Sequence, residues 1–208
     1  GSPDYDLIYG IGAFVNQGLV EVKSGILRAV VALTEGELSE GTWVVTEGAR
    51  LILNGDTAIS KNAASVYLLG PGAEFRGLEG LTSNTGTMQF YGGPAFSTTA
   101  AFVNSGVLMV GGGSSVATSG KFTNSGNLVF GSGGSFSTSA TFDNSGSLNF
   151  ASGSSFSTSA TFNNGGLLNM DGNFGGTGTL INTGTIGGRG TFGALTTVAS
   201  GGTLAPGN

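Results

Sequence analysis

Residues 136–150 read FSTSATFDNSGSLNF, and residues 156–170 repeat the pattern as FSTSATFNNGGLLNM, 20 positions later. From Leu81 to Phe162 the chain keeps this period, with Asn-Ser-Gly or Asn-Thr-Gly at one phase. A fixed period of this length is typical of a solenoid, in which each repeat forms one coil that stacks on its neighbours. The repeat therefore predicts a solenoid.

Alternation within one repeat predicts which side chains face the core. In residues 136–142 the even positions, from Phe136 to Phe142, should point inward, and the hydroxyl-bearing odd positions should point outward. Leu148 and Phe150 continue the inward set after a bend. About three strands per coil then give an all-β, right-handed parallel β-helix with about 20 residues per coil. About ten such coils would form a rod on the order of 45–50 Å long.

One Asn recurs at the bend of each repeat, and its parity places the amide inside the stack. Stacked amides one coil apart can hydrogen-bond along the axis, and Asn tolerates the left-handed backbone that bends need. We therefore predict a structural Asn ladder formed by Asn16, Asn84, Asn104, Asn124, Asn144, Asn164 and Asn182.

The chain divides into three stretches of one continuous solenoid domain. Residues 1–12 are a lead-in whose Gly1-Ser2 resembles a cloning scar. Residues 13–79 should form irregular coils with charged loops, including a strand within 27–33 and a polar turn at 35–41. Residues 80–208 should form the regular coils, and since no capping element follows them we expect the native chain to continue.

Composition limits the chemistry that the chain can perform. The chain has no His and no Cys, which excludes Ser–His and Cys–His catalysis and the usual zinc sites, so we assign no catalytic residue, cofactor or metal ligand. The net charge of −5 lies entirely within residues 1–79, and no basic stripe exists that would suit nucleic acid. No apolar run approaches the ~18 residues of a membrane span, so we expect no membrane insertion.

The irregular coils contain the candidate ligand-contact residues, because insertions in a solenoid often map to its binding side. These candidates are Glu35, Glu37, Glu40, Glu47 and Asp56. A calcium site would need several of their oxygens to converge, and a glycosidase would need two carboxylates ~5–10 Å apart. Together with Arg28, Arg50 and Arg76, these acids leave a polysaccharide-active enzyme as an alternative function. The simpler interpretation is that the charged turns are solvated.

Two further features have both a binding and a structural interpretation. Trp43, Tyr67 and Tyr91 are either sugar-stacking platforms or partly core residues, and their alternation with apolar residues favours the core. The outward Ser and Thr rows, such as Ser137, Ser139 and Thr141, are either a recognition face or simply small polar residues that stack well.

Residues 188–208 read GRGTFGALTTVASGGTLAPGN, and this cadence resembles the β-strand repeats of autotransporter passenger domains. The Asn-Ser-Gly repeats are also similar to those of other large bacterial surface proteins, including filamentous-haemagglutinin-like exoproteins. The resemblance implies a right-handed β-helix displayed at the surface of a Gram-negative cell or secreted from it. No protease motif accompanies it, so the surface function is left open.

These observations predict a non-enzymatic, adhesin-like stalk or contact surface of a larger exported protein. Its expected partners are a glycan or a protein of a host or neighbouring cell, and self-association is a further expectation. A β-helical polysaccharide-active enzyme and a self-associating structural scaffold are the alternatives. In each case the irregular coils are the expected binding region and the regular coils a spacer.

Overall fold

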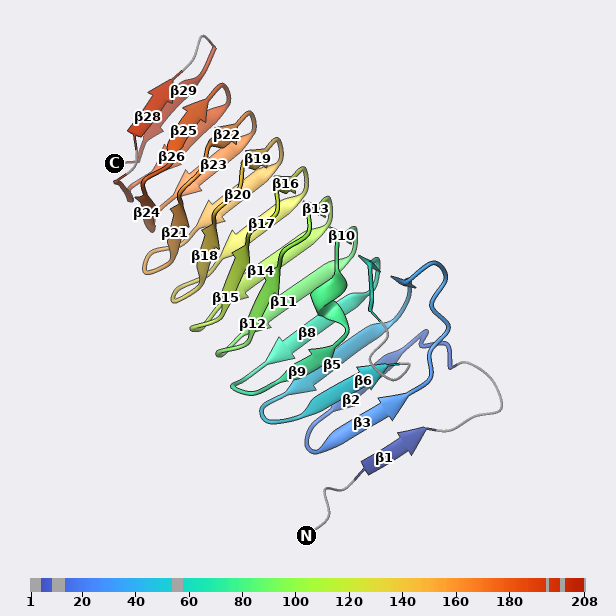
Figure 1. Ribbon diagram of the computed structural model, residues 1–208. Helices are drawn as coiled ribbons and strands as arrows, with labels where there is room; N and C mark the ends of the chain where they lie inside the picture. The colour runs from blue at the N-terminus through green and yellow to red at the C-terminus, as the bar shows by residue number, and fades with distance from the viewer. Residues whose placement is uncertain (1–4, 9–13, 54–57, 194, 199–200, 208) are drawn as a thin grey trace.

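The computed structural model describes residues 5–8, 14–53, 58–193, 195–198 and 201–207. The chain forms an all-β, right-handed parallel solenoid with about 20 residues per turn, as the sequence predicts (Figure 1). Its longest sheet has ten strands, one from each coil, so about nine full turns separate the first strand from the last. The described chain therefore has about ten coils, as expected, and they make about nine turns.

Strands at the same position in successive coils pair in parallel and make the faces of the rod. The ten-stranded sheet contains β2 (Leu19–Val22), β5 (Thr42–Thr46), β8 (Ser65–Leu69), β11 (Thr87–Tyr91), β14 (Val107–Gly111), β17 (Asn127–Phe130), β20 (Ser147–Phe150), β23 (Leu167–Met170), β26 (Thr185–Gly188) and β29 (Thr203–Pro206). The nine-stranded sheet contains β4 (Glu37–Leu38), β7 (Lys61–Asn62), β10 (Ser83–Asn84), β13 (Phe102–Asn104), β16 (Phe122–Asn124), β19 (Phe142–Asn144), β22 (Phe162–Asn164), β25 (Thr179–Asn182) and β28 (Leu195–Val198).

The third face of the rod is split into two sheets. The four-stranded sheet contains β1 (Tyr5–Ile8), β3 (Ile26–Ala29), β6 (Arg50–Leu53) and β9 (Glu74–Arg76). The six-stranded sheet contains β12 (Ala95–Thr98), β15 (Ser115–Thr118), β18 (Ser135–Thr138), β21 (Ser155–Thr158), β24 (Asn173–Gly176) and β27 (Thr191–Phe192). The short 3₁₀ helix η1 (Leu78–Gly80) lies where the two sheets fail to pair, after Gly77, whose φ of 97° turns the chain out of β9 (Figure 1).

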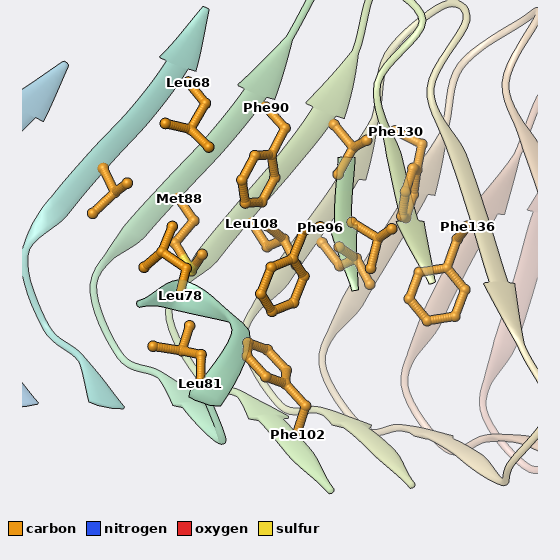
Figure 2. Close-up of a cluster of buried hydrophobic side chains, with 14 of the residues drawn as sticks. Leu68, Leu78, Leu81, Met88, Phe90, Phe96, Phe102, Leu108, Phe130 and Phe136 are labelled. Atoms are coloured by element: carbon orange, nitrogen blue, oxygen red, sulfur yellow. The ribbon is translucent and has the colours of Figure 1, made fainter. Parts of the chain in front are cut away.

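In-register pairing stacks identical side chains along the core. Phe122, Phe142 and Phe162 are Cα partners on successive strands, and the ring centroids of Phe142 lie 5.0 Å and 4.9 Å from those of Phe122 and Phe162. Where the split occurs, Phe90, Phe96 and Phe102 from three strands of one coil point toward one another, with Leu78 beside them (Figure 2). Each fully buried Phe or Leu contributes roughly 1.5–3 kcal/mol to folding, so these stacks dominate stability.

The inward parity predicted for the repeat unit is confirmed. Phe136, Thr138 and Phe142 are buried, whereas Ser137 and Ser139 are exposed. Leu148 and Phe150, predicted inward after the bend, are also buried. Ala140 lies at the corner and is only half-buried, because the chain turns there from β18 toward β19.

The irregular coils follow the same path as the regular ones. The apolar run at 27–33 contributes to β3, a strand as predicted. The expected polar turn at 35–41 instead contains β4, whose Leu38 is 1% exposed and faces the core. This strand was missed because only its second residue is apolar, and two residues are too few to show alternation.

Candidate functional site

A continuous row of Asn side chains runs through the interior beside the nine-stranded sheet. In six consecutive steps the Nδ2 atom of one Asn donates to the Oδ1 atom of the next at 2.7–2.8 Å. The members are Asn62, Asn84, Asn104, Asn124, Asn144, Asn164 and Asn182. From Asn84 to Asn164, Nδ2 also approaches a backbone carbonyl of the next coil, such as that of Ser147 at 3.0 Å from Asn124. Adjacent coils approach closely at this bend, since a Cβ on Gly146 would overlap the carbonyl oxygen of Gly126.

The row differs at its N-terminal end from the one that the sequence predicts. Asn62 belongs to it, although it precedes Asn84 by 22 residues rather than 20. Asn16 does not, because the Cα partner of Asn62 in the preceding coil is Leu38, which has no amide to continue the row. Asn16 hydrogen-bonds instead to the Thr42 carbonyl and the Gly18 amide, and the buried Oδ1 of Asn62 has no partner within the described chain.

The candidate acidic residues lie at different corners of the coil. Glu35 lies in the connection from β3 to β4, Glu40 in that from β4 to β5, and Glu47 in that from β5 to β6. Glu37 is in β4, and Asp56 falls outside the described residues. Within the described ranges no three acidic, His or Cys side chains gather as they would around a metal ion.

Two of the three arginines on which the enzyme alternative rested contact an acid outside the candidate set. Arg50 and Arg76 both contact Glu74, at 2.5 Å and 2.8 Å, on the four-stranded sheet. Arg28 lies on β3 of the same sheet, where its Cα partner is Ile52 on β6. Glu35 has a different partner, Lys61, at 3.9 Å. The ion pairs of the described irregular coils are therefore local contacts between partly exposed side chains.

The outward hydroxyl rows line a shallow depression along the six-stranded sheet. It consists of two adjoining hollows of about 420 Å³ and 390 Å³ that share Thr118. The lining residues are Glu79, Ser97, Thr98, Thr99, Ala117, Thr118, Ser119, Ser137, Thr138, Ser139, Ser157, Thr158, Ser159, Gly176 and Thr177. The buried Thr hydroxyls at its base are hydrogen-bonded within the protein, as Thr138 is to Ala140. Apart from Glu79, the depression is thus an uncharged surface, and the Thr hydroxyls at its base already have hydrogen-bond partners.

The three candidate aromatic residues separate into one core residue and two surface residues. Trp43 is 1% exposed and its Nε1 donates to the Glu40 carbonyl at 3.0 Å, so it is part of the core. Tyr91 is 55% exposed and Tyr67 is half-buried, both on the outer surface of the ten-stranded sheet. The core interpretation is therefore wrong for both tyrosines, because each alternates with inward residues and so faces outward itself.

One ion pair lies on the part of the regular coils that the structure describes. The carboxylate of Asp143 contacts Lys121 Nζ at 2.6 Å and accepts a hydrogen bond from Asn163 Nδ2 at 2.7 Å. Partial burial raises the pKa of Asp143, but the hydrogen bonds from Asn163 and Lys121 and the positive charge of Lys121 outweigh it. The pKa of Asp143 therefore lies below its ordinary value of 3.8.

No model of a known protein family, no curated protein and no solved structure matches this chain. The fold defines its class as a parallel β-helix. The described residues include no helix that is both long and apolar enough to cross a membrane.

Proposed function

We propose that the chain is a stiff segment of an exported bacterial surface or secreted protein, where it acts as an adhesin-like stalk and contact surface without catalysing a reaction. The observation that carries this proposal is the unbroken axial stacking of the core. The Asn row passes from Asn62 to Asn182 without a missing step, and paired strands follow it along the rod.

Two physical properties support a stalk. Bending the rod would break the axial hydrogen bonds and Phe contacts at every coil, so the stack resists bending. The outer rows of the regular coils are Ser, Thr, Asn and Gly with few charges, and such rows stack without repulsion. The cadence of residues 188–208 adds the expectation of display at a Gram-negative cell surface. On this proposal the stalk bears a contact surface for a glycan or a cell-surface protein.

The test combines shape, location and adhesion. X-ray scattering should give a rigid rod on the order of 40–45 Å long for nine turns. The parent protein should be accessible to antibody and protease on intact cells, and beads coated with the chain should adhere to cells or glycan-coated surfaces. Accessibility only after lysis, or polysaccharide turnover by the purified chain, would overturn the proposal. Concentration-dependent oligomers without adhesion would instead favour the self-associating scaffold.

A further inference from the structure

A small cluster on the outer surface of the ten-stranded sheet, formed by Tyr67, Gln89 and Tyr91, has the composition of a ligand site. Gln89 is the Cα partner of Tyr67 on the neighbouring strand and lies two residues before Tyr91 on β11. We name these three residues the Tyr–Gln cluster. None of β8, β11 and β14, the strands that surround it, contains a charged residue.

The ring of Tyr91 covers the backbone of the next coil. Gly111, its Cα partner on β14, is on the outward parity of that strand and yet is buried. A Cβ on Gly111 would lie 3.2 Å from Tyr91 Cδ2, and one on Gly112 would lie 3.1 Å from both Cε1 and Cζ. The ring therefore lies over two glycines, while the 55% exposure of Tyr91 leaves its other side open to solvent.

The polar ends of the cluster are free to bind. Within the described part of the chain, neither tyrosine hydroxyl and no atom of the Gln89 amide forms a hydrogen bond to a protein group. Two phenolic hydroxyls and one amide together offer both donors and acceptors around an open aromatic face. A surface that only packs against an apolar partner would have no use for these unsatisfied groups.

We propose that the Tyr–Gln cluster binds an uncharged hexose-containing glycan, which deepens the proposed function and rests on it. The C–H face of one pyranose ring packs on the open side of Tyr91, and the sugar hydroxyls exchange hydrogen bonds with Gln89 and Tyr67. The cluster should bind a neutral sugar, because the surrounding strands have no cation to pair with a uronate or a sulfate. The net charge of −5 also repels acidic polymers.

The proposal is tested by titrating the chain with neutral oligosaccharides, namely cellohexaose, maltohexaose and mannohexaose, and with oligogalacturonate as the acidic contrast. At least one neutral oligosaccharide should bind, with chemical shift changes at Tyr91 and Gln89 in NMR spectra. Tyr91→Ser should weaken binding about tenfold or more. Gly111→Val keeps Tyr91 but puts a side chain where its ring lies, so it should weaken binding as well.

Leu167→Ser is the matched control, since Leu167 is 43% exposed on β23 of the same sheet, well away from the cluster. It should leave binding unchanged. Binding that survives Tyr91→Ser, a preference for oligogalacturonate, or no neutral binding up to about 1 mM would overturn the proposal. The proposal would also be overturned if the chain bound no glycan but formed a dimer in sedimentation experiments that Tyr91→Ser dissociates. Surface accessibility and rod shape are measured separately, so a displayed stalk that binds no neutral glycan rejects only the glycan site.

Discussion

The irregular coils of residues 14–79 and the regular coils of residues 80–193 use one architecture with different side chains. In the described irregular coils, ion pairs join Lys23 to Glu21, Lys61 to Glu35, and Glu74 to both Arg50 and Arg76. In the described regular coils, the one ion pair joins Lys121 to Asp143. The Asn row runs from Asn182 through Asn84 in the regular coils and enters only one irregular coil, where it ends at Asn62.

The difference shows what strict repetition requires. A residue that recurs at one phase lies roughly 4.8 Å from its copies in the neighbouring coils. At that distance identical charges repel, whereas identical amides hydrogen-bond and identical Phe rings stack. Charged residues are therefore concentrated where the rows are interrupted, and Asp143 is tolerated because Thr123 and Asn163, rather than acids, are its row neighbours. Four changes test this comparison.

Truncating a stacked Phe should have the largest effect. Phe142 is fully buried and contacts the rings of Phe122, Phe136, Phe156 and Phe162. Phe142→Ala should lower the free energy of unfolding by about 3–5 kcal/mol in a urea titration. Phe14→Ala in the irregular coils should cost less, because Phe14 is only half-buried. Equal losses would contradict the view that the regular stacks dominate stability.

Removing one member of the Asn row should come next. Asn124→Ala removes the acceptor of one hydrogen bond from Asn104 Nδ2, which keeps the Asn127 carbonyl, and it removes the donor to Asn144 Oδ1 and to the Ser147 carbonyl. Buried unsatisfied groups cost about 1–3 kcal/mol each, so a loss of about 2–4 kcal/mol is expected by chemical denaturation. Asn16→Ala is the control outside the row and should cost about 1 kcal/mol. If Asn124→Ala lowered the free energy of unfolding no more than Asn16→Ala, the axial hydrogen bonds would add no stability.

Extending the row into the irregular coils should have a smaller, compensated effect. Leu38→Asn removes a buried apolar side chain but places an amide opposite the unpaired Oδ1 of Asn62. It should therefore be less destabilising than Leu38→Ala by about 1 kcal/mol, the net value of one hydrogen bond. Thermal unfolding of the two variants makes the comparison. If Leu38→Asn is less stable than Leu38→Ala, the Asn row ends at Asn62 for a reason other than the lack of a donor at position 38.

The smallest effect should come from the ion pair between Lys121 and Asp143 on the regular coils. Because the pKa of Asp143 is lowered in the folded state, its stabilisation is present above pH 3.8 and is lost as the pH falls through the lower folded value. The pair is partly exposed, so the contribution should be below about 1 kcal/mol. Asp143→Asn should remove that part of the pH dependence, which lies below the ordinary pKa of 3.8. A variant whose acid unfolding curve is unchanged would show that the pair contributes nothing.

The fold was predictable because the same 20-residue pattern recurs in many consecutive coils. The 20-residue period gave the solenoid and the alternation in residues 136–142 gave the inward set, which the burial of Phe136 and Phe142 confirms. Asn62 was missed because its coil is two residues longer, so a search at one fixed period passes over it. Gln89 was missed because nothing in the sequence separates an outward Gln on a strand from any other polar surface residue.

The sequence by itself therefore determined the class of fold, the coil length and the residue types of the core rows, because period and parity are local properties. Only the tertiary structure decided what each side chain meets in the next coil. It placed Leu38 against Asn62, separated Glu47 from Glu35 and Glu40 at different corners, and set the Tyr91 ring over Gly111. Those neighbours are about 20 residues away along the chain, and a shift of one or two residues in any coil changes them.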